Sequence, residues 1–151
     1  MDFDILVRAK ILRKKEVDIY KIRSLLSSAE KNAKAAIAIP LNENTATIIF
    51  REVYESIRQL GDANWRLRGY EPSNHEISLD GLKEIDVKDK FKLNYLSRFK
   101  KVRHDANYEG FIVTINQTRE IIDFWRSCGE EIIKVVNNKL YKVLNKIKEL
   151  E

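Results

Sequence analysis

Apolar residues recur every three to four positions along most of the chain, which is the spacing of a buried helix face. In the first part of the chain a charged stretch interrupts this stripe near Lys15, and the stripe then continues to Ile37. It stops before Pro40, because proline disfavours helical geometry at the residue that precedes it. The pattern predicts either one kinked helix over about 3–38 or two helices that meet near Lys15.

A second long helix is expected to begin after Asn42 or Asn44, since either side chain can accept hydrogen bonds from the first helical N–H groups. It is expected to end near Gly69, because glycine tolerates the left-handed conformation that closes many helices. Residues 71–74 are then predicted to form a turn or loop. The apolar stripe of this helix comprises Ala46, Ile49, Phe50, Val53, Ile57 and Leu60.

The second half of the chain predicts three further helical segments. A short helix is expected from Ser78, and a longer one over about 87–106. Thr114 and Gln117 have the spacing of a capping box, in which each side chain accepts a hydrogen bond from the backbone of the other. The helix that they begin is expected to run almost to Glu151, a length of about 50 Å at 1.5 Å per residue.

These elements predict an all-α fold, an up-and-down bundle of four to five antiparallel helices that forms a single domain over 1–151. The one β-rich run, 111–114, has no evident partner, so no sheet is expected. A terminal helix this long is expected to outrun the intrachain core. Its remaining apolar stripe would then suit a partner helix in a homodimer.

Composition is compatible with a folded domain, because 44% of the residues are hydrophobic and 34% are charged. The net charge of +5 permits an anionic partner without requiring one. Cys128 is the only cysteine, so no intrachain disulfide can form, and a lone thiol suits a reducing compartment. No apolar run reaches the length of a membrane span, and acidic residues at positions 2 and 4 are unlike a signal peptide. A cytoplasmic location without membrane association is therefore expected.

Most motifs that bind cofactors or metals are missing. The sequence has no Gly-rich phosphate loop, no dinucleotide-binding fingerprint and no zinc-protease motif. With two histidines and one cysteine it offers too few ligands for a transition-metal site. We therefore predict no cofactor and no metal.

The end of the helix predicted over 87–106 combines several cations with a histidine. Arginine can stabilise phosphoryl oxygens, and histidine can move a proton near neutral pH, so together they could cleave a phosphodiester without metal. The alternative is a solvated helix end, in which Lys101 and Asp105 form a surface pair and the cations complement the helix dipole. The residues concerned are Arg98, Lys100, Lys101, Arg103, His104, Asn107 and Tyr108.

Three short motifs, taken together and in their order along the chain, resemble the HEPN superfamily over roughly residues 20–150. Residues 103–108 resemble the Arg-x-x-Ala-Asp-Tyr signature of one branch of this superfamily, with Asn107 in place of Asp. Arg98 and His104 fit the looser superfamily pattern of an Arg and a His separated by four to six residues. Residues 69–75 resemble the Gly-x-x-Pro-x-x-His loop that follows the second helix in these proteins.

The resemblance implies a small helical bundle whose dimer brings two Arg/His motifs into one cleft. Many members are metal-independent ribonucleases, often toxins paired with a nucleotidyltransferase antitoxin, and others bind nucleotides or proteins without cutting. If the chain resembles the nuclease members in function too, His104 activates a ribose 2′-hydroxyl, and Arg98 or Arg103 holds the phosphate. If Arg103 is the motif arginine, Tyr108 occupies the histidine position, and a phenol with a pKa of about 10 is a poor base. If Arg98 is the motif arginine instead, Arg98 and His104 lie about 240° apart around the helix axis, unless the helix ends or bends between them.

Five other side chains are assigned mainly structural roles. Trp65, Trp125 and Cys128 lie on apolar stripes and are expected in the core. Tyr54 is expected to line the core or a cleft, and His75 to be a cap or surface group. The sequence thus favours a protein that binds RNA or a nucleotide, with ribonuclease activity as one form of it. A non-catalytic protein-interaction module and a purely structural bundle are the alternatives.

Overall fold

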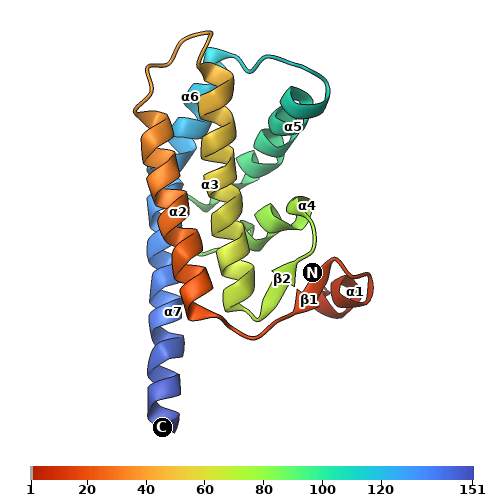
Figure 1. The fold of residues 1–151 in the computed structure, drawn as a ribbon, viewed down its shortest axis with the longest axis vertical. Coiled ribbons are helices and arrows are strands. Elements are labelled where there is room, and N and C mark those ends of the chain that lie inside the picture. Colours follow the sequence, from red (N-terminus) through yellow and green to blue (C-terminus); the bar gives the residue numbers. More distant parts are fainter. Residues whose placement is uncertain (1) are drawn as a thin grey trace.

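The computed structural model describes residues 2–151 and is mostly helical, with 73% helix and 4% strand. The predicted all-α class is confirmed. Figure 1 shows three long helical columns side by side: α2 (Ile19–Ile37), α3 (Ala46–Leu67) and the run from α6 (Ile115–Phe124) into α7 (Glu130–Leu150). The remaining helical segments lie along one side of α3, and α7 extends beyond them at the C-terminal end.

The first part of the chain forms two helices, as in one of the two predicted alternatives, but they do not meet near Lys15, because residues 9–18 between them are not helical. A short α1 (Phe3–Arg8) ends before Lys10, whose φ of 60° lies in the left-handed region and turns the chain. The strand β1 (Leu12–Lys14) follows and pairs antiparallel with β2 (Tyr70–Pro72). The expectation of no sheet, and of a loop over 71–74, is therefore wrong in part. Strands of three residues are too short for alternation of apolar and polar residues to reveal them.

The end of α3 agrees with the sequence, but its start does not. The residue before the helix is Thr45, whose side chain makes no capping hydrogen bond, and neither Asn42 nor Asn44 caps α3. The Asn42 side chain instead accepts from the backbone N–H groups of Asn44 and Thr45, at 2.8 and 3.1 Å, and so caps the turn that precedes the helix. At the other end Gly69 has a φ of +87°, which is the left-handed conformation that favours glycine. Sequence therefore predicted the end of α3, which depends on backbone freedom at one residue, but not the residue at which α3 begins.

Between β2 and α6 the chain is built from short pieces. These are α4 (His75–Ser78), the 3₁₀ turns η1 (Leu79–Leu82) and η2 (Lys90–Asn94), and α5 (Tyr95–Tyr108). The helix predicted over 87–106 therefore begins later, because its expected first turns are the 3₁₀ turn η2. The α-helix then continues without a break through Tyr108.

The last helical column begins with the predicted capping box. The Thr114 hydroxyl accepts from the backbone N–H of Gln117 at 3.1 Å, and the Gln117 side chain accepts from the backbone N–H of Thr114 at 2.9 Å. A π-helical turn, η3 (Trp125–Gly129), joins α6 to α7. The column is thus continuous in direction, as predicted, but is interrupted by one turn of wider geometry.

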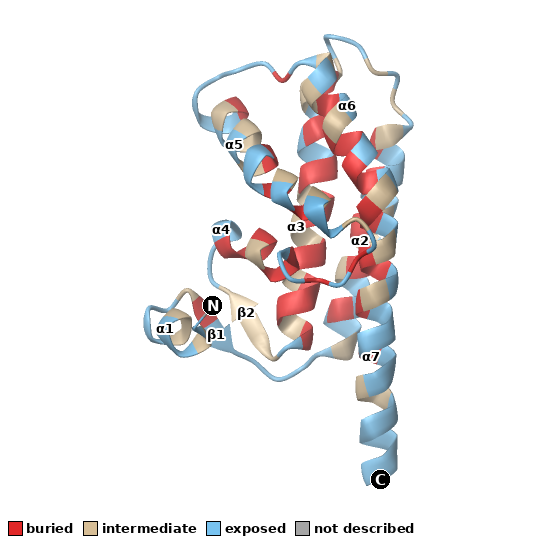
Figure 2. Ribbon diagram, turned by 180° about the vertical axis from the view of Figure 1, so that it is seen from behind, coloured by how far each residue is buried: buried red, intermediate tan, exposed pale blue. Residues whose placement is uncertain are grey.

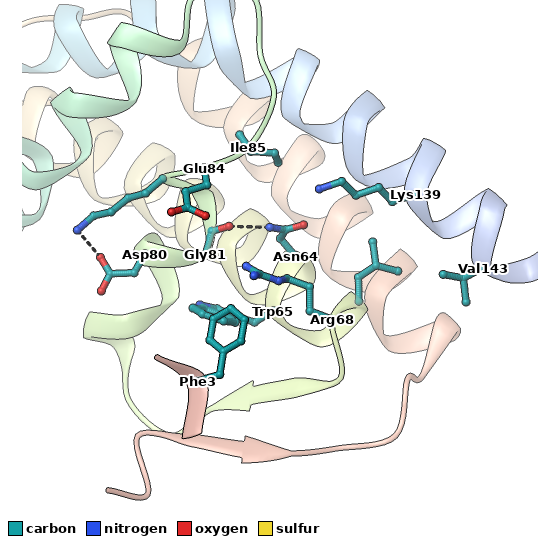
Figure 3. A pocket seen from close by; sticks show the side chains of 12 residues that line it. Phe3, Asn64, Trp65, Arg68, Asp80, Gly81, Glu84, Ile85, Lys139 and Val143 are labelled. Carbon is teal, nitrogen blue, oxygen red and sulfur yellow. Dashed lines mark hydrogen bonds and ion pairs between the residues drawn. The ribbon is translucent and has the colours of Figure 1, made fainter. Parts of the chain in front are cut away.

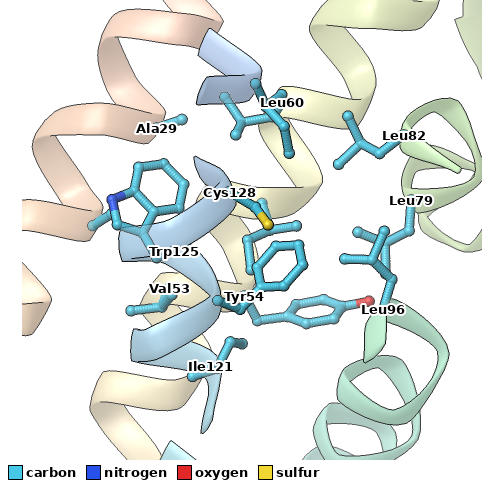
Figure 4. Close-up of a cluster of buried hydrophobic side chains, with 14 of the residues drawn as sticks. Ala29, Val53, Tyr54, Leu60, Leu79, Leu82, Leu96, Ile121, Trp125 and Cys128 are labelled. Atoms are coloured by element: carbon cyan, nitrogen blue, oxygen red, sulfur yellow. The ribbon is translucent and has the colours of Figure 1, made fainter. Parts of the chain in front are cut away.

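The core lies between α2, α3 and the last helical column, and its buried residues line the facing sides of these helices (Figure 2). Trp65 and Trp125 are almost fully buried, as predicted, and Cys128 packs within the same cluster as Trp125 (Figure 4). The cluster holds α5 against α3 through Leu96 and Phe99. Burial of such large apolar side chains is the main stabilising contribution to a domain of this size.

Beyond Leu140 the helix α7 is largely exposed (Figure 2). Among residues 2–151, no helix combines the length and the apolar character that crossing a membrane requires.

Candidate nucleic-acid interface

The last turns of α5 place most of the candidate residues on one side of the helix. At about 100° per residue, six of the seven candidate residues lie within an arc of about 160° around the helix axis. The opposite side of the helix, which includes Phe99 and Ala106, is buried against α3. We call this arc the basic face of α5; it comprises Lys100, Lys101, Arg103, His104, Asn107 and Tyr108.

Arg98 lies apart from the basic face. Its guanidinium forms an ion pair with Glu120 of α6 and lies 4.8 Å from the centre of the Tyr95 ring. Because α5 neither ends nor bends before Tyr108, Arg98 and His104 keep their separation of about 240° around the axis. Within one chain, then, the structure does not bring Arg98 and His104 together, which catalysis by this pair would require.

Arg103 occupies the edge of the basic face nearest α3. Its guanidinium carbon lies 5.6 Å from the centre of the Tyr54 ring, and in residues 2–151 it forms no ion pair with an acid. Burial raises the pKa of Tyr54 to about 12, although the positive charges of Arg103 and Arg58 oppose this shift. Tyr54 thus lines this edge as a neutral phenol, and the charge of Arg103 is available to an anion.

His104 and Tyr108 form the outer part of the basic face. They are one helical turn apart, and their ring centres lie 4.9 Å from each other with the planes tilted by 46°. Both side chains are exposed, as is Asn107 beside them. Flat rings and hydrogen-bonding groups next to cations are suited to contact the bases and phosphates of a single-stranded nucleic acid.

The two lysines of the face differ in their partners. Lys101 and Asp105 form the surface pair expected from the sequence, at 3.0 Å. Lys100 donates to the backbone carbonyl of Glu76 at 3.2 Å and so links α4 to α5. His75, the exposed first residue of α4, is therefore close in the chain to this link. The loop motif, residues 69–75, thus ends one residue before a contact with α5.

One neighbouring cation was not anticipated. The Arg51 guanidinium donates to the carbonyl oxygen of Ala106 at 3.4 Å, which places a positive charge from α3 next to the last turn of α5. No local pattern distinguishes Arg51 from other exposed cations, because its position depends on how α3 and α5 cross. It extends the positive surface around Arg103.

No cluster of three or more His, Cys, Asp or Glu side chains with metal-binding geometry occurs in residues 2–151. Comparison of the chain with protein-family models, with curated proteins and with solved structures found no match. Function must therefore be inferred from the geometry of the chain itself.

Proposed function

We propose that this protein binds RNA through the basic face of α5, as a homodimer of HEPN type. The observation that carries the proposal is Arg103, a half-buried cation without an acidic partner in the described residues, beside His104, Asn107 and Tyr108 on a solvent-facing arc. Arginine and lysine contact phosphates, and the two rings supply surfaces on which bases can stack. A nucleotide carries the same groups and is the smallest ligand that this face would bind.

Ribonuclease activity is the catalytic form of this proposal, and the HEPN resemblance supports it. His104 would remove the proton from a ribose 2′-hydroxyl, whose oxygen attacks the adjacent phosphorus while the 5′-oxygen leaves. The products are a 2′,3′-cyclic phosphate and a 5′-hydroxyl end. Arg103 would stabilise the charge that develops on the phosphoryl oxygens. A nucleotidyltransferase-type antitoxin would be the partner that restrains such an enzyme.

A homodimer is supported by the exposed end of α7. This part of the helix extends past the rest of the molecule, and it exposes Tyr141, Ile147 and Leu150 (Figure 1). Light scattering coupled to size exclusion should give about twice the chain mass of 17.7 kDa. A monomer would exclude a cleft shared between two copies and would leave RNA binding to a single basic face.

A non-catalytic interaction module is the second candidate, and one observation favours it. Tyr108, Phe111 and Ile112 are 63–78% exposed and follow each other closely at the end of α5. The backbone N–H of Val113 donates to Thr47, so this segment lies beside the start of α3, where Ile48 is also exposed. An apolar surface of this kind is typical of protein contacts.

The first experiment measures binding of a labelled single-stranded RNA by fluorescence anisotropy across a range of salt concentrations. Affinity should fall at least about tenfold over a few-fold rise in salt, since each phosphate contact releases counterions. The double variant Lys100→Glu/Arg103→Glu should bind at least about tenfold more weakly at low salt. The matched control is Arg23→Glu/Lys31→Glu, which makes the same charge change on exposed positions of α2. Equal weakening by both double variants would show that net charge alone controls binding.

The same RNA tests cleavage in the presence of EDTA. The parent protein should form a 2′,3′-cyclic phosphate, and His104→Ala should slow the reaction about 10²–10⁴-fold, as expected for loss of a general base. If the parent binds RNA but does not cut it, the binding proposal stands without catalysis. If it binds no RNA even at the lowest salt, the interaction module is the better description.

A further inference from the structure

A separate cavity lies in the other half of the molecule. Its volume is about 530 Å³, and it opens where the end of α3 meets η1 and α7, with Phe3 of α1 at one side (Figure 3). This size is within the range of small-molecule sites. None of its lining residues belongs to the basic face of α5, so it is a second, independent candidate site.

Two of the cations that line this cavity form no ion pair in the described residues, although the carboxylates of Glu84 and of Asp80, which pairs with Lys83, line the same cavity. Arg68 from the end of α3 and Lys139 from α7 form no ion pair within residues 2–151. The Arg68 guanidinium carbon lies 4.7 Å from the Phe3 ring centre and 5.1 Å from that of Trp65, so the two aromatic rings fix its position. Partial burial and the nearby charge of Arg68 lower the pKa of Lys139, although the carboxylate of Asp86 opposes this shift. An anion placed between the two cations would remove this repulsion.

The wall of the cavity also holds an unsatisfied hydrogen-bond acceptor. Asn64 is 3% exposed, and its Nδ2 donates to the carbonyl oxygen of Gly81 at 2.6 Å. This bond fixes the orientation of the amide, which leaves Oδ1 buried without a donor in the described chain. In Figure 3 this oxygen points away from Gly81 and towards Lys139. Buried acceptors are nearly always paired, so an N–H group in the cavity would complete this one.

We propose that the cavity binds a mononucleotide, with its phosphate between Arg68 and Lys139 and an N–H group of its base donating to Asn64 Oδ1. The ligand must carry an anion and an N–H donor and must fill several hundred Å³. Inorganic phosphate lacks the donor, a nucleoside lacks the anion, and an amino acid is smaller than the space available. The proposal does not depend on RNA binding at α5.

The two tryptophans provide a test specific to this site. Trp65 lines the cavity and Trp125 lies in the core, so each indole N–H gives its own signal in a ¹⁵N-correlated spectrum. The variant Trp125→Phe identifies which signal is which. Titration with each of the four ribonucleoside monophosphates should shift the Trp65 signal to saturation at millimolar concentration for at least one of them, and should leave the Trp125 signal in place.

Matched variants then test the contacts. Lys139→Met and Arg68→Met should each raise the dissociation constant about tenfold or more, because each removes a charged hydrogen bond. Lys134→Met removes the same charge from an exposed position elsewhere on α7 and should have no effect. The Lys100→Glu/Arg103→Glu protein should also bind as the parent does, which separates this result from the RNA experiment.

Adenosine, inorganic phosphate and glutamate are the comparison ligands, each expected to bind at least about tenfold more weakly than the best nucleotide. Phosphate binding equal to that of the nucleotide would reduce the cavity to a simple anion site and overturn the proposal. Glutamate binding that is tighter than that of the best nucleotide would overturn the proposal in favour of an amino acid as the ligand. The proposal also fails if no nucleotide moves the Trp65 signal, or if Lys139→Met binds with parental affinity.

Discussion

The basic face of α5 and the cavity beside Asn64 are both positively charged, but they are made in different ways. The basic face consists of successive turns of a single helix, and its side chains are mostly exposed. The cavity is lined by residues from α1, α3, η1 and α7, and its key amide is buried. The first therefore depends on helix geometry alone, whereas the second depends on the packing of segments that are distant in the sequence.

The largest effect is expected where α3 and the segment after it come closest. A methyl group added to Gly61 would overlap the carbonyl oxygen of Ser78, and one added to Gly81 would lie 2.8 Å from the Trp65 indole. We expect Gly61→Ala to lower the free energy of unfolding by about 3 kcal/mol, because backbone cannot move aside as a flexible side chain can. Urea unfolding at neutral pH measures this change.

Gly110→Ala is the control for this substitution. Gly110 has a φ of +70° and open space around it, so alanine there adds backbone strain of about 1 kcal/mol without a clash. In folded Gly61→Ala protein, the Trp65 signal should move because η1 is displaced. If Gly61→Ala lowers the free energy of unfolding no more than Gly110→Ala does, the cavity depends less on packing than its geometry indicates.

The next largest effect on stability is expected at the ion pairs of Arg58, which lie on α3 between the basic face of α5 and the cavity. Arg58 is largely buried and donates to Glu55 at 2.5 Å and to Asp62 at 2.7 Å, and Asp62 also accepts from Ser78 at 2.6 Å. Arg58→Met should cost about 2 kcal/mol, because it leaves Asp62 partly buried without its cation. It should be compared with Lys34→Met, which removes the exposed Glu30–Lys34 pair and should cost less than about 0.5 kcal/mol. Equal costs would show that Asp62 is well solvated without Arg58.

The same contrast explains what sequence could predict. Apolar spacing predicted α2, α3 and the last helical column, and the capping box and Gly69 marked helix ends, because these features depend on residues close in sequence. The cations of the basic face were visible for the same reason. The β1–β2 pair, Arg51 and the cavity were missed, since each requires contacts between distant segments. The late start of α5 was missed because a 3₁₀ turn has nearly the same apolar spacing as an α-helix.

Tyr54, beneath the edge of the basic face, allows a test by pH. Burial raises its pKa to about 12, so the folded protein favours the neutral phenol. Its contribution to stability is complete below about pH 10, the ordinary pKa, and is lost as the pH rises from about 10 to 12. Over this range the parent should lose up to about 2 kcal/mol more unfolding free energy than Tyr54→Phe. Equal losses in the two proteins would indicate that water reaches the Tyr54 hydroxyl.

The smallest expected effect is the one that best separates the two regions. Asn107 is exposed near the end of α5, and alanine has a higher helix propensity than asparagine, by a few tenths of a kcal/mol. Asn107→Ala should therefore leave the free energy of unfolding unchanged or raise it by less than about 0.5 kcal/mol, as measured by urea unfolding. Its RNA affinity should nevertheless fall if the amide contacts phosphate or base. A loss of more than about 1 kcal/mol in stability would mean that Asn107 supports the fold, and the basic face would then have to be treated, like the cavity, as a product of packing.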